Sequence, residues 1–396
     1  MDNKILQMKS LLLLCLVFAF QLSFAADERI RIVGGPYVQM VGEHEASVVW
    51  VTNKKAQSWV EIAPDDQFNF YAEERPQFFQ TYLGRKVTGT IHTIKITGLE
   101  KGTTYRYRIF SKEIREEAPY RVWYGDVATV ARLDRRELSF TTLDSDKEEI
   151  SFVVVNDIHG DNESLAALLE NVEKERTDFV FFNGDMVSHM DSEKDLFEGF
   201  MNTAVKLFAA RMPFYYSRGN HESRGIYASR YMDYFPTNTG KPYYCFREGP
   251  VFFVVLDGGE DKPDSDIEYH GTAAFDLYRE EQAKWLQQVT ESAEFRSAPF
   301  KVAVIHIPPF GSTWHGPLHT RKLFVPILDK AGIDLMLCGH LHQYQYIESG
   351  QEECSFPVLV NSVKEAAHIR ANKEKMTMEI RDVAGKILHT FTYKVK

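Results

Sequence analysis

Hydrophobic and polar positions follow two different patterns along the chain, and the change comes near residue 145. In the first part, short apolar stretches alternate with polar or glycine-containing turns, and the clearest stretches are 46–51, 92–96, 105–109 and 138–142. Repeated short strands with turn residues between them are typical of a small antiparallel sandwich. Residues 27–145 are therefore predicted to form an all-β domain.

The second pattern alternates buried strands with helices. A charged run at 144–149, interpreted as a solvated linker, precedes the apolar residues 152–155, which have the composition of a strand covered on both faces. Helical spacing then relates Leu165, Leu168, Leu169 and Val172, and later Gln282, Trp285, Leu286 and Val289. Further buried strands are predicted at 179–182, 251–256 and 302–305. Residues 150–396 are thus predicted to form an α/β domain, whose ligands lie beyond the carboxyl ends of its strands.

The N-terminal residues 1–26 have the layout of a secretory signal peptide. Two lysines precede the apolar run 11–20, and the small residues Ser23 and Ala25 stand before the expected cleavage point. An uncleaved membrane anchor is the alternative, although the run is short for a membrane span. No later segment is long and apolar enough to span. We therefore expect an exported protein, periplasmic or extracellular, with no membrane span after removal of the leader.

Composition narrows the possible partners. The chain has 396 residues, is 44% hydrophobic and carries a net charge of −10. Binding to duplex nucleic acid is not expected, because neutralising phosphates requires an excess of Lys and Arg. After the leader, Cys245, Cys338 and Cys354 allow at most one disulfide. Cys338 lies in an apolar run and is expected to be a buried thiol, whereas pairing of Cys245 with Cys354 is left open. Nothing in the sequence indicates an oligomeric state.

Residues of the kind that bind metals follow five of the apolar runs. In chain order they are Asp157 and His159, Asp185, Asn220 and His221, His306, and His340 and His342. Because strand ends converge at one edge of an α/β sheet, these side chains are expected to meet in one cleft. The neighbouring glycines, Gly160, Gly184, Gly219 and Gly339, allow sharp turns and close approach of the backbone.

The residue types indicate the chemistry. Imidazole nitrogens and carboxylates suit Zn, Mn, Fe or Ni, whereas an oxygen-only set would indicate Mg or Ca. Seven or eight ligands are too many for one tetrahedral ion, but they fit two metals that share a carboxylate. Two such ions can clamp the attacking and leaving oxygens of a phosphoryl displacement, and they acidify bound water. A dinuclear hydrolase centre is therefore predicted.

The motifs DIHG (157–160), GD (184–185), GNHE (219–222) and GHLH (339–342), together with His306, resemble those of the calcineurin-like metallophosphoesterase superfamily. The resemblance covers roughly residues 150–350. The N-terminal region is similar to the fibronectin type III-like domain of purple acid phosphatases, on the basis of GPYVQ (35–39), the stretch around Trp50, residues 92–109 and FTT (140–142). The fold implied is an α/β, four-layer sandwich of two mixed sheets flanked by helices, preceded by an all-β fibronectin type III-like sandwich.

The resemblance also implies a role for each residue. Asp157, His159 and His342 would hold a first metal ion. Asn220, His306 and His340 would hold a second, and Asp185 would bridge the two. His221 would contact the phosphate and help to protonate the leaving oxygen. The implied cofactors are two divalent or trivalent ions, of Fe, Mn or Zn.

The chain departs from purple acid phosphatases at an informative place. That family carries Asp-x-Gly and GDxxY, and its tyrosine binds iron and gives the colour. Here His159 replaces the glycine, and Ser188 stands at the tyrosine position. One ligand is lost and another regained, which implies a purple acid phosphatase-like architecture with an ordinary metallophosphoesterase centre. The family's usual Glu-Arg after GHxHxY is also replaced, by Gln345 and Tyr346.

The expected function is hydrolysis of small phosphomonoesters by a metal-bound hydroxide, with His221 assisting the leaving group. A phosphodiesterase or nucleotide hydrolase using the same centre is an alternative, and an exported binding protein with a vestigial site is another. Arg218 and His315 are predicted substrate contacts, although His315 also fits an ordinary exposed loop. The charged loop 258–272 is interpreted either as a solvated tip or as an insertion that shapes the substrate site.

Overall fold

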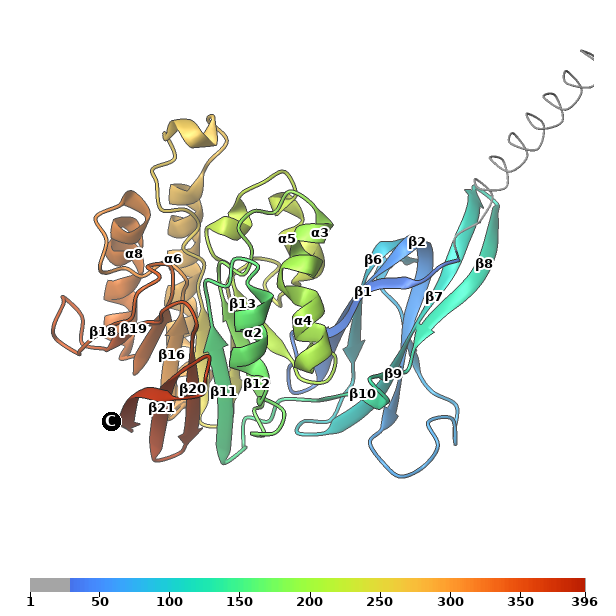
Figure 1. The fold of residues 1–396 in the computed structure, drawn as a ribbon, viewed down its shortest axis with the longest axis horizontal. Coiled ribbons are helices and arrows are strands. Elements are labelled where there is room, and N and C mark those ends of the chain that lie inside the picture. Colours follow the sequence, from blue (N-terminus) through green and yellow to red (C-terminus); the bar gives the residue numbers. More distant parts are fainter. Residues whose placement is uncertain (1–28, 396) are drawn as a thin grey trace, which may run out of the picture.

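The computed structural model describes residues 29–395. Figure 1 shows a β-rich part, formed by the N-terminal strands, beside an α/β part that contains the C-terminus. The predicted leader, residues 1–26, lies outside the described residues. Within the described part of the chain, no helix has the length and apolar character needed to cross a membrane.

The N-terminal strands pair with one another in antiparallel fashion, as the alternating pattern predicts. The long strands are β1 (Ile32–Gln39), β2 (Glu45–Pro64), β6 (Thr88–Thr97), β7 (Thr104–Ala118), β8 (Arg121–Val130) and β10 (Arg136–Thr141). Four two-residue strands complete the set: β3 (Gln77–Phe78), β4 (Thr81–Tyr82), β5 (Arg85–Lys86) and β9 (Arg132–Leu133).

Strand β2 is longer than its hydrophobic pattern indicates. The apolar stretch 46–51 is followed by four polar residues, yet the strand continues to Pro64. A register shift between Val51 and Ala56 interrupts its pairing with β6, as a β-bulge does. Before the shift β2 lies between β1 and β6, and after it the strand pairs mainly with β7. The polar residues therefore mark a bend within one strand rather than its end.

The first sheet of the α/β part contains three parallel strands followed by antiparallel ones. The parallel strands are β11 (Glu149–Val155), β12 (Phe179–Asn183) and β13 (Phe214–Ser217). β20 (Glu365–Asn372), β21 (Lys375–Asp382) and β22 (Ile387–Lys394) extend it at one edge. At the other edge β13 pairs with β1, through Phe214 and Gln39, so the N-terminal strands continue this sheet.

The second sheet is also mixed. Its order is β14 (Tyr244–Glu248), β15 (Val251–Val255), β16 (Phe300–Val304), β17 (Leu335–Cys338), β19 (Val358–Val360) and β18 (Gln345–Ile347). The four strands from β15 to β19 are parallel, and the two edge strands are antiparallel to their neighbours.

Helices cover the outer faces of the two sheets. The first sheet is covered by α2 (Asn162–Leu169) and by a continuous helical segment made of α3 (Glu193–Leu196), η1 (Phe197–Met201), α4 (Asn202–Ala204) and η2 (Val205–Ala209). The second sheet is covered by α6 (Phe275–Glu291), α7 (Ala293–Ser297) and α8 (His315–Ala331). Shorter helical turns are η3 (His221–Ser223), η4 (Ala228–Arg230), α5 (Tyr231–Tyr234) and η5 (Ile267–Tyr269).

Alternation along β15 explains why four layers form. Side chains on a strand point to opposite faces in turn. Phe253 packs toward the first sheet, with its ring centroid 5.1 Å from that of Phe152 and 5.5 Å from that of Phe179. Phe252 and Val254, on the other face, belong to the core under α6 and α8. The predicted fold class is confirmed: two mixed sheets lie between helices, and an all-β part precedes them.

The cysteines occupy separate parts of the second sheet. The three that the structure describes are free thiols. Cys338 is buried on β17, as predicted. Cys245 lies on the edge strand β14, whereas Cys354 lies between β18 and β19 at the opposite edge. The open question of a Cys245–Cys354 disulfide is therefore answered in the negative for this structure.

Candidate metal centre

The predicted ligand residues lie at one edge of the two sheets, where parallel strands end. Asp157 and His159 follow β11, Asp185 follows β12 and Asn220 follows β13, while His306 follows β16 and both His340 and His342 follow β17. The first four come from the first sheet and the last three from the second. The structure brings all seven into one cluster, because both sheets have parallel strands that run toward the same edge.

One half of the cluster consists of Asp157, His159 and His342. Nε2 of His342 lies 3.2 Å from Oδ1 of Asp157 and 3.2 Å from Nε2 of His159. One ligand atom from each of the three residues lies within 4.8 Å of the other two. These three side chains can therefore reach a single ion.

The other half consists of Asn220, His306 and His340, with Asp185 between the halves. Oδ1 of Asn220 lies 3.0 Å from Nδ1 of His340. Oδ2 of Asp185 lies 3.0 Å from Nε2 of His306 and 4.0 Å from Nε2 of His159. The same carboxylate thus faces histidines of both halves, which is the placement that a bridging ligand requires.

Two atoms in this cluster are buried without a hydrogen-bond partner. They are Oδ1 of Asp157 and Nε2 of His306. The approach of His306 Nε2 to Asp185 lacks hydrogen-bond geometry in spite of its short distance. Because buried polar atoms are almost always satisfied in native proteins, two such atoms in one place need an explanation. A cation bound by nitrogen and carboxylate ligands would satisfy both.

The electrostatics of the cluster favour a positive charge. Burial alone would lower the pKa of His306, but the Asp185 and Asp157 carboxylates raise this pKa to about 10. Burial alone would raise the pKa of Asp185, yet His306 beside it holds this pKa below its ordinary value. Without a metal, a proton on His306 balances the two carboxylates. A metal ion replaces that proton, because a ligating imidazole is neutral.

Most of the predicted ligand residues share one strained backbone conformation. Five ligand residues have a φ angle in the left-handed region: Asp157 (51°), His159 (48°), Asp185 (53°), His340 (74°) and His342 (57°). This region is uncommon for residues other than glycine and costs about 1–3 kcal/mol at each position. It persists only where surrounding contacts impose it. The β11 loop is held against the β12 loop by hydrogen bonds from the N–H groups of Asp157 and His159 to the carbonyls of Gly184 and Asp185, each 3.0 Å long.

Three glycines allow the strand-end loops to approach the ligands. A Cβ atom on Gly184 would lie 2.4 Å from the His306 ring, and the φ angle of this glycine is +81°. A Cβ atom on Gly339 would lie 2.7 Å from Oδ2 of Asp157. Any larger residue would displace a ligand at either position. The predicted need for close approach is thus met at Gly184, Gly339 and Gly219, where a Cβ atom would lie 2.2 Å from Oδ1 of Asp185. It is not met at Gly160, where a Cβ atom would have nothing within 4 Å, although the φ angle of +84° there fits the predicted sharp turn.

Glu222 organises the loops beneath the cluster, a role that sequence reasoning missed. This fully buried carboxylate accepts hydrogen bonds from the N–H groups of Asp185, Met186 and Gly219 at 2.8–2.9 Å, and from the Tyr216 hydroxyl at 2.8 Å. Burial and the neighbouring Asp185 raise its pKa. The motif GNHE contains this glutamate, so the signal was present in the sequence, but nothing local showed which donors it would receive.

His221 lies at the rim of the cluster and is oriented by two neighbours. Its Nδ1 lies 2.7 Å from the Ser188 carbonyl, so Nδ1 carries the proton and Nε2 is an acceptor. Nη1 of Arg224 donates to that Nε2 at 3.1 Å. Arg224 is held in turn by Glu260, through bonds of 2.8 and 2.9 Å, and this pairing raises its pKa. Arg224 and Glu260 were not predicted, because no local motif joins residues 36 positions apart.

Known families match both parts of the chain. Residues 150–344 match the model of the calcineurin-like phosphoesterases, and these residues contain the whole cluster. The chain carries a calcineurin-like phosphoesterase domain. Residues 35–124 match the model described as the N-terminal domain of purple acid phosphatases. The two matches lie in the order that the sequence resemblance implied.

Plant purple acid phosphatases are similar to this chain in sequence. Purple acid phosphatase 22 of Arabidopsis thaliana is 23% identical over 78% of this chain and 65% of its own length. Probable purple acid phosphatase 20 of the same plant is 24% identical over 78% of this chain and 67% of its own length. The solved structure of TT1561 from Thermus thermophilus is 13% identical, covers 62% of this chain and 99% of its own, and has a TM-score of 0.37. The chain spans between about half and two thirds of the length of the plant relatives.

The iron-loaded protein is expected to lack the strong visible band of a tyrosinate-bound iron. Ser188 occupies the tyrosine position of purple acid phosphatases, and its carbonyl is engaged by His221. A serine supplies no phenolate, so no tyrosinate charge-transfer band should form. The visible absorption spectrum of the iron-reconstituted protein checks this. A purple preparation would contradict the predicted ligand set.

The two predicted substrate contacts are engaged by acidic partners. Arg218 of the phosphoesterase domain donates from Nε to Oδ2 of Asp257 at 2.9 Å, and the same oxygen accepts from the Tyr278 hydroxyl at 2.7 Å. Nε2 of His315 lies 2.8 Å from Oδ1 of Asp276. Neither residue is among the contacts of the seven-residue cluster described above. Their roles in substrate binding remain predictions.

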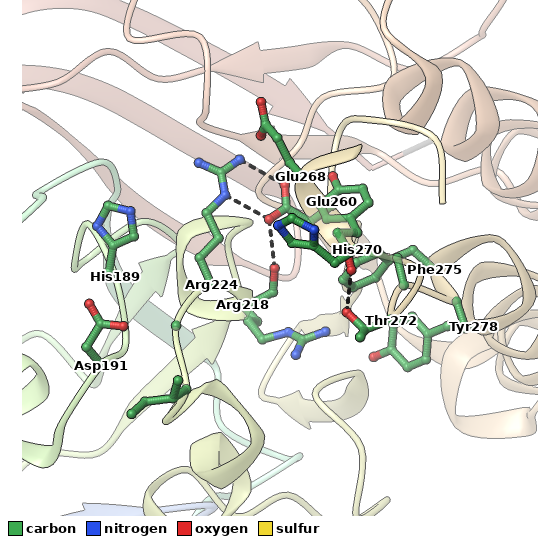
Figure 2. Close-up of a pocket in the computed structure, with 16 residues that line it drawn as sticks. His189, Asp191, Arg218, Arg224, Glu260, Glu268, His270, Thr272, Phe275 and Tyr278 are labelled. Atoms are coloured by element: carbon green, nitrogen blue, oxygen red, sulfur yellow. Dashed lines mark hydrogen bonds and ion pairs between the residues drawn. The ribbon is translucent and has the colours of Figure 1, made fainter. Parts of the chain in front are cut away.

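A pocket of about 820 Å³ adjoins the rim of the centre beside Arg224 (Figure 2). Its other walls include Arg218, Phe275 and Tyr278. The charged loop singled out in the sequence contributes Glu260, Glu268, Tyr269, His270 and Thr272. Figure 2 shows Arg224 paired with Glu260 of this loop, with His189 on the other side of Arg224. The loop is therefore part of a concave surface next to His221.

Proposed function

We propose that the protein is an exported phosphoesterase that hydrolyses phosphomonoesters at a dinuclear metal centre. The convergence of seven nitrogen and oxygen donors, with Asp157 Oδ1 and His306 Nε2 buried and unpartnered, is the observation that carries the proposal. The donor set suits Fe, Mn or Zn. The matching phosphoesterase and purple acid phosphatase families support the reaction class.

In this proposal each half of the cluster holds one ion. Asp157, His159 and His342 form one ligand group. Asn220, His306 and His340 form the other, and Asp185 is shared. When bound, the ions acidify a water molecule and polarise the phosphoryl oxygens. The protein positions the donors beforehand, since each stands on a loop fixed by a strand end.

His221 and Arg224 are proposed to handle the substrate phosphate and the leaving oxygen. Nδ1 of His221 is fixed by the Ser188 carbonyl, so Nε2 points toward the centre and lies 3.8 Å from Oδ2 of Asp185. A phosphate dianion is a better partner for a guanidinium than imidazole is. Arg224 therefore turns to the phosphate when substrate arrives. Nε2 of His221 is then free to take up a proton from solvent and to donate it to the leaving oxygen, while Nδ1 keeps its own proton on the Ser188 carbonyl.

Replacing Arg224 with glutamine is expected to lower kcat/KM for an aryl phosphomonoester by about 10²-fold, the usual effect of removing one charged donor from a transition state. Metal content should stay unchanged, because Arg224 contacts His221 and Glu260 rather than the ligand groups. Arg230→Gln is the matched control, since Arg230 forms an exposed ion pair with Asp233. Equal kinetics in the two variants would remove Arg224 from the reaction.

Paired assays test the reaction class. Metal-reconstituted protein is given an aryl phosphomonoester, an aryl phosphodiester and a nucleoside monophosphate. Faster turnover of the monoester supports the proposal, and preference for the diester supports the alternative phosphodiesterase. Protein that holds its metals but is inert on all three would favour the other alternative, an exported binding protein with a vestigial site.

The proposed substrate is a small phosphoester rather than duplex nucleic acid. The net charge of −10 disfavours a long phosphate backbone, whereas the pocket beside Arg224 has room for a leaving group. Export is proposed because two lysines precede the apolar run at residues 11–20, as in a secretory signal peptide. This run lies outside the described residues.

A further inference from the structure

A second cluster of metal-binding side chains joins the first turns of α6 and α8. Asp276 is the second residue of α6, and His315 is the first residue of α8. His319 lies four residues further on, so both imidazoles stand on one face of the helix. One ligand atom from each of the three residues lies within 4.8 Å of the other two.

The donor spacing in this cluster matches that of the dinuclear centre. Nε2 of His315 lies 2.8 and 2.9 Å from the two oxygens of Asp276, and Nδ1 of His319 lies 3.0 Å from Oδ1. In the dinuclear centre the closest histidine–carboxylate distances are 3.2 Å, for Asp157 with His342, and 3.0 Å, for Asp185 with His306. Both clusters thus place imidazole and carboxylate donors close enough together to reach one shared cation.

Nδ1 of His319 provides a second, independent observation. This atom is buried and has no hydrogen-bond partner, although Asp276 Oδ1 is only 3.0 Å away. The same combination of a short distance and missing hydrogen-bond geometry occurs at His306 Nε2 in the dinuclear centre. A buried nitrogen that faces a carboxylate without bonding to it is placed as a ligand would be.

In the described part of the chain, Arg279 is the one Arg or Lys side chain that contacts Asp276. Its Nη1 donates to Oδ1 of Asp276 at 2.8 Å. The guanidinium is also held by the carbonyls of Gly258, at 2.8 Å from Nε, and Glu260. It therefore keeps its place without Asp276. Oδ2 of Asp276 contacts Nε2 of His315 at 2.9 Å, and an ion would bind between these two atoms in place of a proton.

We propose that Asp276, His315 and His319 bind a third metal ion, a divalent transition metal for which Zn²⁺ is the probe. Three protein ligands leave one position for water, and the side chains of His315 and Asp276 are 37% and 35% exposed, so an ion can enter. The ion ties α6 to α8. Phe275 and Tyr278 on α6 line the pocket beside Arg224, so the site fixes one wall of that pocket. His315 is then a ligand rather than a substrate contact.

Zinc titration of the chelator-treated full chain tests this proposal. Wild-type protein should bind one more equivalent of Zn²⁺ than His319→Ala, and zinc should raise the thermal midpoint of wild type more than that of the variant. His389→Ala, at an exposed histidine on β22, is the matched control and should keep the wild-type stoichiometry. Equal zinc binding by wild type and His319→Ala would overturn the proposal.

Three further variants separate this site from the dinuclear centre and from misfolding. Asp185→Asn should still bind the equivalent of Zn²⁺ assigned to Asp276, His315 and His319. The double variant Asp185→Asn/His319→Ala should lose this equivalent. His315→Gln, which removes the other imidazole, should reproduce the loss seen with His319→Ala while far-ultraviolet circular dichroism stays unchanged. Loss of that equivalent in Asp185→Asn alone, with His319 intact, would contradict a separate site.

Discussion

Replacing Asp185 with asparagine is expected to abolish turnover and to lower metal content at both positions of the dinuclear centre. The Asp185 carboxylate faces both halves, with Oδ2 3.0 Å from Nε2 of His306 and 4.0 Å from Nε2 of His159. An amide carries no charge and presents an NH₂ group where an oxygen must bind. Loss of shared coordination should lower kcat by more than about 10³-fold, since removal of a single electrostatic donor already costs 10²–10³-fold.

The measurement is metal content by mass spectrometry together with turnover of an aryl phosphomonoester. Asp233→Asn is the control, because Asp233 is a surface carboxylate paired with Arg230. A loss of metal from only one of the two positions would make Asp185 a ligand of that ion alone. An unchanged stoichiometry would remove it from the centre.

Replacing Glu222 with alanine is expected to destabilise the fold by at least about 3 kcal/mol. The change leaves the N–H groups of Asp185, Met186 and Gly219 without their acceptor, and each buried unsatisfied donor costs about 1–3 kcal/mol. Glu222→Gln should be milder, because one oxygen remains. Metal affinity should fall in both variants, since the Asp185 loop loses its support.

Urea unfolding measures the stability, and Glu198→Ala provides the control. Glu198 forms an exposed i,i+4 pair with Lys194, so its loss should cost a few tenths of a kcal/mol. A Glu222→Ala protein as stable as Glu198→Ala would show that water replaces the carboxylate, and the assigned role of Glu222 would be wrong.

The sequence predicts the parts of the fold that depend on periodicity. Continuous apolar runs identified β11, β12, β15 and β16, because strands covered on both faces need apolar side chains throughout. The same logic located the candidate site, since each chemically active residue directly follows such a run. Asp157 and His340 could therefore be expected in one place although 183 positions separate them.

Features that depend on long-range partners could not be predicted in this way. The bend in β2 arises from an exchange of neighbouring strands, and the helical segment 193–209 includes π-helical turns that no simple period describes. The pairs of Arg224 with Glu260 and of Arg218 with Asp257 join different loops. A charge pattern along one chain does not show which opposite charge will lie beside it after folding.

The positive φ angles of the predicted ligand residues are a further feature that local sequence patterns do not predict. Asp and His are enriched among non-glycine residues with a positive φ angle, but most Asp and His residues have a negative one, so their identity at Asp157 or His159 does not predict the angle. The strain follows from hydrogen bonds between loops. It is thus visible only when the loops are brought together.

Anomalous diffraction from crystals of the metal-loaded protein shows whether two ions bind in the seven-residue cluster. We expect two adjacent peaks at this edge of the sheets, one bonded to Asp157, His159 and His342 and the other to Asn220, His306 and His340, with Asp185 reaching both. A single peak, or peaks bonded to other residues, would contradict this expectation.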